Sequence, residues 1–305
     1  MLRRAARLIV LTVLVLAVME IALVAWHFPW DADDPVRRED ALQEYYDYAY
    51  TGDGRAAVLK DNPSTRAAQN ARTTSNILWR VSEFVREHRL EKARVLDVGS
   101  GSGYLQDAVE DYTGIDISRS VASHYHKRFV AGTATAMPFK DHEFDAVWSI
   151  WVLEHIPNPE AALSEIRRVV KPGGVLYLLP AWQCTPWAAQ GYEVRPYDDF
   201  GIRGKLIKAS IPIRTLPEFL FITLVPNRVI RSAASAWGPT RLRYRHITPN
   251  YQEYWMADSD AVNSLDRAEM AMWFETRGDT CLNCERGWKR YLQADGPLII
   301  RRAAH

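Results

Sequence analysis

The sequence has almost no net charge, no internal repeats and no low-complexity tracts. Its 305 residues include 38 Lys and Arg against 37 Asp and Glu. Duplex-DNA-binding proteins need a strong basic surplus, so we expect no nucleic-acid partner. The missing repeats exclude a solenoid, and the ordinary hydrophobic content excludes a disordered chain. The length allows one or two globular domains.

Cysteine is also scarce. The three cysteines, Cys184, Cys281 and Cys284, are too few for a disulfide-stabilised scaffold of this length. The spacing of Cys281 and Cys284 matches half of a zinc site, but structural zinc takes four ligands and the sequence has no second pair. We therefore expect ordinary thiols and no bound metal.

One long apolar run stands near the N-terminus. Three arginines precede the 21 residues from Leu8 to Phe28. As a helix this run measures about 31 Å, which matches the hydrocarbon thickness of a bilayer. We predict that residues 1–30 form a membrane anchor helix, either single-pass or interfacial. A cleaved signal peptide and a buried core helix are the alternatives, and the run lacks the small-residue cleavage site of a signal peptide.

The rest of the chain alternates between short apolar runs and helical patterns. Residues 31–75 are polar and rich in tyrosine, and we predict that they form a connector and lid. Within residues 76–305 the predicted strands end at Val98, Ile117, Ile150 and Leu179. A helical pattern at Glu160–Val170 ends at a Lys-Pro-Gly-Gly stop signal. This alternation predicts an α/β domain with a parallel sheet covered on both faces.

A glycine-rich loop follows the first predicted strand. Residues 95–103 read VLDVGSGSG, and the glycines allow the backbone to turn tightly and to approach a ligand. The spacing is G-x-G-x-G, which differs from the dinucleotide-type G-x-G-x-x-G. Asp116 ends the next strand, where an acid can accept hydrogen bonds from both hydroxyls of a ribose. The two features predict a ribose-bearing cofactor.

Residues 95–180 resemble the class I S-adenosylmethionine-dependent methyltransferases of the compact-core subgroup. The matching stretches are VLDVGSGSG, GIDIS, GTATAMPF and FDAVWSIWVLEHIPNPEAALSEIRRVVKPGGVLYL, which begin at residues 95, 114, 132 and 144. The resemblance implies a Rossmann-like, doubly wound sheet of seven mostly parallel strands with an antiparallel last strand. It places the last strand pair at Tyr254–Val262 and Gly296–Arg301.

The same resemblance implies which residues bind S-adenosylmethionine. Those expected to hold its methionine part are Asp97, Gly99, Ser100, Gly101 and Gly103. Those expected beside the ribose, the adenine and the sulfur are Asp116, Ile117, Thr133, Ala134, Ser149 and Ile150. Thr133 stands where the family usually has an acid, and a hydroxyl is a weaker partner for the adenine amine.

Methyl transfer from a sulfonium is an in-line displacement that needs alignment and a dry pocket. A general base is required only if the acceptor must lose a proton. His155 follows the fourth predicted strand and is the candidate base, because an imidazole titrates near pH 6.5; the alternative is that it caps the next helix. Trp151, Trp182 and Tyr192 are the candidate acceptor-binding residues, with core packing as the alternative for the tryptophans.

Residues 203–246 form a basic insertion with nine Lys or Arg and one acid around an apolar stretch at 216–226. Basic residues beside a short apolar segment suit an anionic membrane surface. A cap helix packed on the core and an RNA-binding stretch are the alternatives.

Together these features predict a membrane-anchored, S-adenosylmethionine-dependent methyltransferase. We expect it to act on a lipidic or lipid-linked small molecule or glycan. Because the methyl donor is made in the cytosol, we expect the catalytic domain to face the cytoplasm, although the N-terminal arginines alone favour the opposite side for the domain. The alternatives are a non-catalytic cofactor-binding scaffold and a dinucleotide-dependent oxidoreductase.

Overall fold

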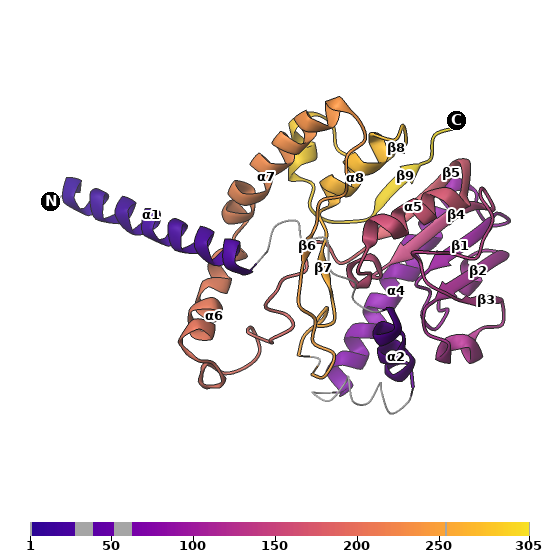
Figure 1. The fold of residues 1–305 in the computed structure, drawn as a ribbon, viewed down its shortest axis with the longest axis horizontal. Coiled ribbons are helices and arrows are strands. Elements are labelled where there is room, and N and C mark those ends of the chain that lie inside the picture. The colour runs from indigo at the N-terminus through magenta and orange to yellow at the C-terminus, as the bar shows by residue number, and fades with distance from the viewer. Residues whose placement is uncertain (1, 28–38, 52–62, 254, 305) are drawn as a thin grey trace.

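The computed structural model describes residues 2–27, 39–51, 63–253 and 255–304. A seven-stranded sheet forms its centre, with the strand order β3-β2-β1-β4-β5-β9-β8 (Figure 1). The strands are β1 (Arg94–Val98), β2 (Asp111–Asp116), β3 (Arg128–Ala131), β4 (Phe144–Ile150), β5 (Val170–Leu179), β8 (Thr280–Cys281) and β9 (Leu298–Arg301). The first five are parallel, and β9 runs antiparallel to β5 and β8. The predicted α/β class, with seven strands and one antiparallel strand, is confirmed.

Helices cover both faces of this sheet. Helix α4 (Pro63–His88) packs on one face, and helices α5 (Pro159–Val169) and α8 (Arg267–Glu275) pack on the other. Successive side chains of a strand point to opposite faces, so Val147 joins the α5 side and Trp148 joins the α4 side. Both are fully buried, and each large side chain removed from water contributes about 1.5–3 kcal/mol.

Helix α5 begins and ends where its sequence indicates. The Asn158 side chain accepts a hydrogen bond from the backbone N–H of Ala161 at 3.1 Å, and Pro159 occupies the first helical position. Both features fix a helix N-terminus. The helix ends at Val169, within one residue of the prediction, and β5 begins at the next residue.

The predicted strand at Tyr254–Val262 is wrong. Residue 254 lies outside the described residues, and residues 255–262 form turns and bends, with the Ser259 N–H donating to the Met256 carbonyl. The partner of β9 is instead β8, which has only two residues. So short a strand carries no alternation of polar and apolar residues, which is the signal that identifies strands in a sequence.

The connection between the glycine-rich loop and β2 is short. Only a three-residue 3₁₀ turn, Gln106–Ala108, separates the glycine-rich loop from β2. Without a long helix after the loop, the backbone N–H groups that can face a ligand here are those of the loop.

Cys281 and Cys284 form a disulfide, so the expectation of ordinary thiols is wrong. Their Cα atoms lie 5.6 Å apart, within the range that a disulfide needs. The turn between them is held by Asn283, whose side chain donates to the Pro297 carbonyl at 2.8 Å and accepts from the Ile299 N–H at 3.0 Å. Cys184 is a buried free thiol.

The basic insertion forms two helices, α6 (Ile202–Arg214) and α7 (Pro217–Ala234). Two ion pairs fix α7 to α8: Arg228 with Asp266 at 2.7 Å and Arg231 with Glu269 at 2.9 Å. A separate two-stranded ladder joins β6 (Arg245–His246) to β7 (Asn263–Ser264). The two ion pairs hold the second helix of the insertion to the domain core.

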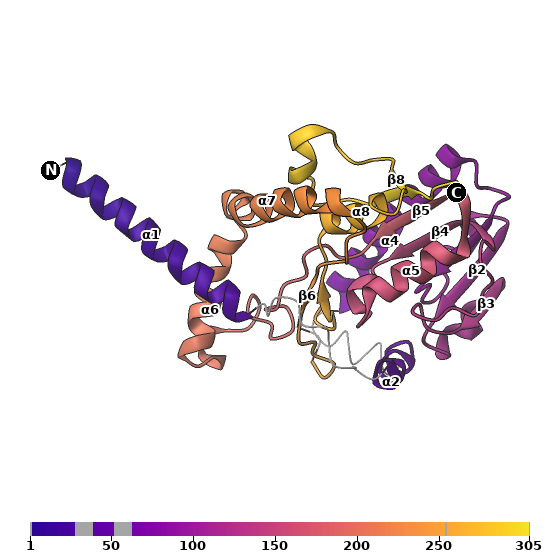
Figure 2. The ribbon, with the colours of Figure 1, turned by 45° about the horizontal axis from the view of Figure 1, so that its top comes forward.

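Helix α1 (Leu2–His27) extends away from the rest of the molecule and touches α6 (Figures 1 and 2). Its apolar side chains between Leu8 and Met19 are exposed. Among the described residues, no helix is both long enough and apolar enough to cross a membrane.

Candidate active site

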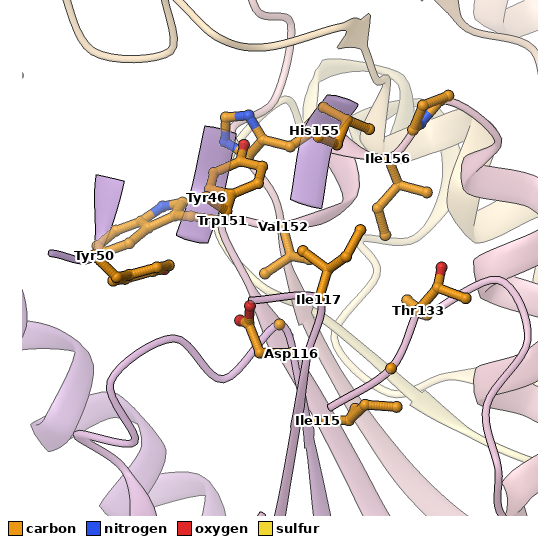
Figure 3. A pocket seen from close by; sticks show the side chains of 15 residues that line it. Tyr46, Tyr50, Ile115, Asp116, Ile117, Thr133, Trp151, Val152, His155 and Ile156 are labelled. Carbon is orange, nitrogen blue, oxygen red and sulfur yellow. The ribbon is translucent and has the colours of Figure 1, made fainter. Parts of the chain in front are cut away.

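A cavity of about 220 Å³ opens at the carboxyl ends of the central strands. Asp116 and Ile117 at the end of β2, and Thr133 after β3, form one wall (Figure 3). Trp151, after β4, and the side chains of helix α2 (Glu39–Ala49) complete it. Ligands of doubly wound sheets bind at this edge because the chain reverses its strand order there and leaves a crevice.

The glycine-rich loop is restricted to glycine by both conformation and space. Gly99 has φ +72°, and a Cβ built on it would lie 2.2 Å from a methyl carbon of Val152. Gly101 has φ +50°, and its Cβ would lie 2.9 Å from the hydroxyl of Tyr50. These glycines let the loop backbone approach whatever fills the cavity.

Asp116 is fixed by the loop that it faces. Its two carboxylate oxygens accept backbone hydrogen bonds, one from Gly101 at 2.8 Å and one from Ser118 at 2.9 Å. Burial raises the pKa of Asp116 above its ordinary value. Each carboxylate oxygen can accept further hydrogen bonds, so the pair can still bind two hydroxyl groups.

Asp97 lies behind the loop and is buried. The hydroxyl of Tyr112 donates to its carboxylate at 2.8 Å, and burial raises the pKa of Asp97 to about 7. A carboxyl group in this state ionises readily when a positive charge approaches.

The other predicted cofactor residues fall into two groups. Gly99, Asp116, Ile117, Thr133 and Ala134 line the cavity. The remaining ones lie next to it without lining it, namely Asp97, Ser100, Gly101, Gly103, Ser149 and Ile150. Thr133 shares a hydrogen bond with Thr135 between their hydroxyls at 2.9 Å.

Helix α2 closes the cavity from the side opposite the strands. Asp47 accepts three hydrogen bonds from the loop after β2: from the Ser118 hydroxyl at 2.8 Å, the Arg119 N–H at 2.7 Å and the Ser120 N–H at 3.1 Å. This attachment places Tyr46 and Tyr50 over the opening (Figure 3).

Trp151 has an unusual backbone conformation. Its φ is +56°, a left-handed conformation that costs a bulky residue roughly 1–3 kcal/mol. Its N–H donates to the Leu179 carbonyl at 2.8 Å, and its ring lines the cavity while remaining 39% exposed. The surrounding structure therefore holds this aromatic ring at the cavity in spite of the strain.

The other two predicted acceptor-binding residues do not line the cavity. The indole N–H of Trp182 donates to the Gly296 carbonyl at 2.8 Å, which ties it to the turn before β9. The ring of Tyr192 packs on Phe200 with 4.6 Å between centroids.

His155, the predicted base, lies on the cavity wall beside Tyr46. Its Nδ1 is 3.6 Å from Asp260 Oδ2, and its Nε2 is 3.8 Å from Glu154 Oε1. Burial alone would lower the pKa of His155, but the carboxylates of Asp260, Glu154 and Asp258 raise it overall. Burial also raises the pKa of Glu154 to about 7.

Sequence reasoning did not assign roles to Tyr46, Tyr50 and Asp260. The Tyr46 hydroxyl donates to Asp260 at 3.0 Å across 214 residues of sequence. The tyrosine-rich stretch indicated a lid, but no spacing in the sequence links it to Asp260.

Comparisons with known proteins agree with this geometry. Residues 96–178 match a family model described as "Methyltransferase domain". The chain is 41% identical over 92 residues to demethylmenaquinone methyltransferase of Renibacterium salmoninarum, which is 27% of this chain and 39% of that protein. It is 27% identical over 188 residues to fatty-acid O-methyltransferase of Mycolicibacterium smegmatis, covering 55% and 67% of the two chains.

Among solved structures, magnesium protoporphyrin IX methyltransferase from Synechocystis is similar, with a TM-score of 0.47 and 14% identity. That alignment covers 87% of this chain and 100% of the other. The chain spans 39% of the length of the menaquinone relative, so the match concerns the domain rather than the whole protein.

Residues 96–178 thus form the core of a class I S-adenosylmethionine-dependent methyltransferase domain, and the resemblance seen in the sequence is confirmed. The cofactor is S-adenosylmethionine. The residues fit it, because Asp116 retains acceptor capacity for ribose hydroxyls and the loop glycines leave room for the methionine part. Ile117 and Ala134 add apolar side chains to the wall of the same cavity.

Proposed function

We propose that this protein methylates an apolar small molecule of lipid character at a membrane surface. The observation that carries this proposal is the composition of the cavity beyond the cofactor residues. Tyr46, Trp151 and Ile156 present aromatic and aliphatic surface there. Such walls bind an apolar or ring-shaped acceptor and exclude water from the displacement.

The protein's own part in the reaction is alignment. S-adenosylmethionine supplies an activated methyl group when bound. Asp116 and the Gly99 loop hold the donor, and helix α2 closes over it through Asp47. Trp151 then positions the acceptor, and such alignment accounts for several kcal/mol of rate acceleration in general. The role of His155 as a general base stays a prediction.

The position of α1 supports the membrane part of the proposal. Its apolar side chains from Leu8 to Met19 are exposed, and lipid is an environment that favours such a helix. Two relatives are named for a demethylmenaquinone and for fatty acids, which are apolar acceptors. We propose that α1 lies at the interface of a bilayer, with the catalytic domain on the cytoplasmic side.

The direct test uses the full chain in lipid nanodiscs with methyl-labelled S-adenosylmethionine and a total lipid extract. The proposal predicts label in the organic phase, lost in Asp116→Asn. Label found only in water-soluble products would contradict the lipid acceptor. If the folded chain fails to bind S-adenosylhomocysteine, the methyltransferase function itself is wrong. Protease protection of a C-terminal tag in sealed vesicles tests the cytoplasmic orientation.

A further inference from the structure

Three carboxylates and one imidazole meet beside the cavity. Glu154 and His155 belong to the short 3₁₀ turn after β4, and Asp258 and Asp260 belong to the segment before β7. The Val262 N–H donates to the Glu154 carbonyl at 2.9 Å, which holds the two segments together. Ligand atoms of Glu154, His155 and Asp258 all lie within 4.8 Å of one another.

The negative charges of Glu154 and Asp260 have little compensation. The Glu154 side chain is fully buried and that of Asp260 is 8% exposed. In the part of the chain that the structure describes, neither forms an ion pair with a lysine or arginine; their one cationic neighbour is His155. Burying ionised carboxylates without a partner is strongly unfavourable.

Several polar atoms of the cluster also lack hydrogen bonds. Within the described residues, Glu154 Oε2, Asp260 Oδ1 and His155 Nδ1 are buried and make none. Glu154 Oε1 accepts one hydrogen bond, from the Ala181 N–H at 3.0 Å, and retains a further lone pair, so both oxygens of this carboxylate can bind another ligand. Buried polar atoms of native proteins are almost always satisfied, so these atoms indicate a missing partner.

We propose that Glu154, His155 and Asp258 bind one divalent metal ion at the wall of the cavity. Ligand atoms on a cation at about 2.1 Å are separated by about 3 to 4 Å, so the 3.8 Å between Glu154 Oε1 and His155 Nε2 already fits. A ligand atom of Asp258 lies within 4.8 Å of those of Glu154 and His155. Two carboxylates and one imidazole suit a first-row ion such as Mn²⁺ or Zn²⁺ better than Ca²⁺.

Asp260 occupies the position of an orienting group. It lies 3.6 Å from His155 Nδ1, on the side of the ring opposite the nitrogen that faces Glu154. Metal-binding histidines characteristically donate their other N–H to a carboxylate, which fixes the ring. The Tyr46 hydroxyl in turn donates to Asp260, so the lid helix is connected to the proposed ion.

The site would also explain why His155 reaches the cavity. His155 lines the cavity, so an ion bound to it would lie close to the space where the acceptor is proposed to bind. The ion site is distinct from the residues proposed to bind S-adenosylmethionine. Binding of the ion can therefore be measured separately from binding of the cofactor.

The test uses the tag-free full chain, first treated with a chelator and then titrated with Mn²⁺, with free Mn²⁺ counted by electron paramagnetic resonance. We expect one ion per chain. Glu154→Gln and Asp258→Asn should each weaken binding at least about tenfold, and Asp260→Asn should weaken it less. Glu110→Gln, an exposed acid elsewhere, serves as the matched control and should leave binding unchanged.

Binding of S-adenosylhomocysteine is measured on each sample to show that it is folded. A wild-type chain that binds cofactor but no Mn²⁺ or Zn²⁺ would overturn the metal site and leave the proposed methyltransferase function intact. Ion binding that survives both Glu154→Gln and Asp258→Asn would overturn it as well. Failure to bind cofactor concerns the proposed function instead.

Discussion

At the scale of single residues, Trp151 connects backbone strain to the acceptor site. A left-handed φ of +56° is natural for glycine and costly for other residues. We expect the free energy of unfolding to be about 1 kcal/mol larger for Trp151→Gly than for Trp151→Ala, because glycine adopts this φ without strain. The opposite effect, the greater flexibility of glycine in the unfolded chain, is smaller. Chemical denaturation of the two variants measures this difference. Equal stabilities would show that the conformation is not strained.

Asp97 predicts how cofactor binding depends on pH. Burial raises its pKa to about 7, so the folded protein holds it mostly protonated below that pH. If Asp97 pairs with the ammonium group of the cofactor, binding requires the ionised form. Affinity for S-adenosylhomocysteine should therefore rise by up to about tenfold per unit between pH 5 and 7, and level off above.

The variant Asp97→Asn isolates this effect. Burial also raises the pKa of Asp116, which responds in the same sense, so some dependence on pH should remain in the variant. Calorimetric titrations at four pH values provide the comparison. A wild-type affinity that is independent of pH, or that falls as pH rises, would contradict the role of Asp97.

The sequence predicts residues of the site to different degrees. Asp116 lies at the end of a predicted strand, and parallel strands bring their carboxyl ends to one edge, whereas Thr133 is assigned through the family resemblance. Tyr46 and Asp260 come from segments without strong periodicity and meet only through tertiary contacts. The Cys281–Cys284 disulfide depends on a turn shaped by Asn283, which spacing alone does not reveal.

At the scale of elements, α2 acts as a lid fixed through Asp47. Removing three hydrogen bonds to one carboxylate should loosen it without affecting the sheet, because Asp47 contacts only the loop after β2 in these bonds. We expect Asp47→Ala to release S-adenosylhomocysteine about tenfold faster, since hydrogen bonds to charged groups contribute about 1.5–3 kcal/mol each when shielded and less near solvent.

Stopped-flow displacement measures the release rate. Glu44→Ala is the matched control, because Glu44 lies exposed on the same helix. If Asp47→Ala and Glu44→Ala release the cofactor at the same rate, the lid is not held by Asp47.

Most elements of the sheet are predictable for a physical reason. Strands β1 and β4 and residues 175–179 of β5 are largely buried and mostly apolar, and α5 carries a cap and a stop signal. Strand β8 and the pair β6–β7 have two residues per strand, too few to show any period. Their positions follow from neighbouring strands rather than from their own composition.

At the scale of the whole molecule, α1 is the element that we propose attaches the protein to a membrane. Leu11 and Val15 lie one turn apart, and both are exposed. An aspartate near the middle of a membrane helix costs about 2.5–3.5 kcal/mol. The full chain with Leu11→Asp and Val15→Asp should therefore lose most of its binding to vesicles of phosphatidylglycerol and phosphatidylcholine, as measured by co-sedimentation.

The control keeps both positions apolar, with Leu11→Phe and Val15→Leu. It should sediment with the vesicles as the wild type does. If the aspartate variant sediments equally well, α1 does not attach the protein to lipid.

The most direct test of the account is calorimetric titration of the full chain with S-adenosylhomocysteine. We predict one cofactor per chain, at least about 100-fold weaker binding in Asp116→Ala, because two hydrogen bonds to a charged group are lost, and unchanged binding in the exposed control Asp107→Ala. A folded wild-type chain that does not bind, or an Asp116→Ala variant that binds as tightly, would contradict the assignment of this site.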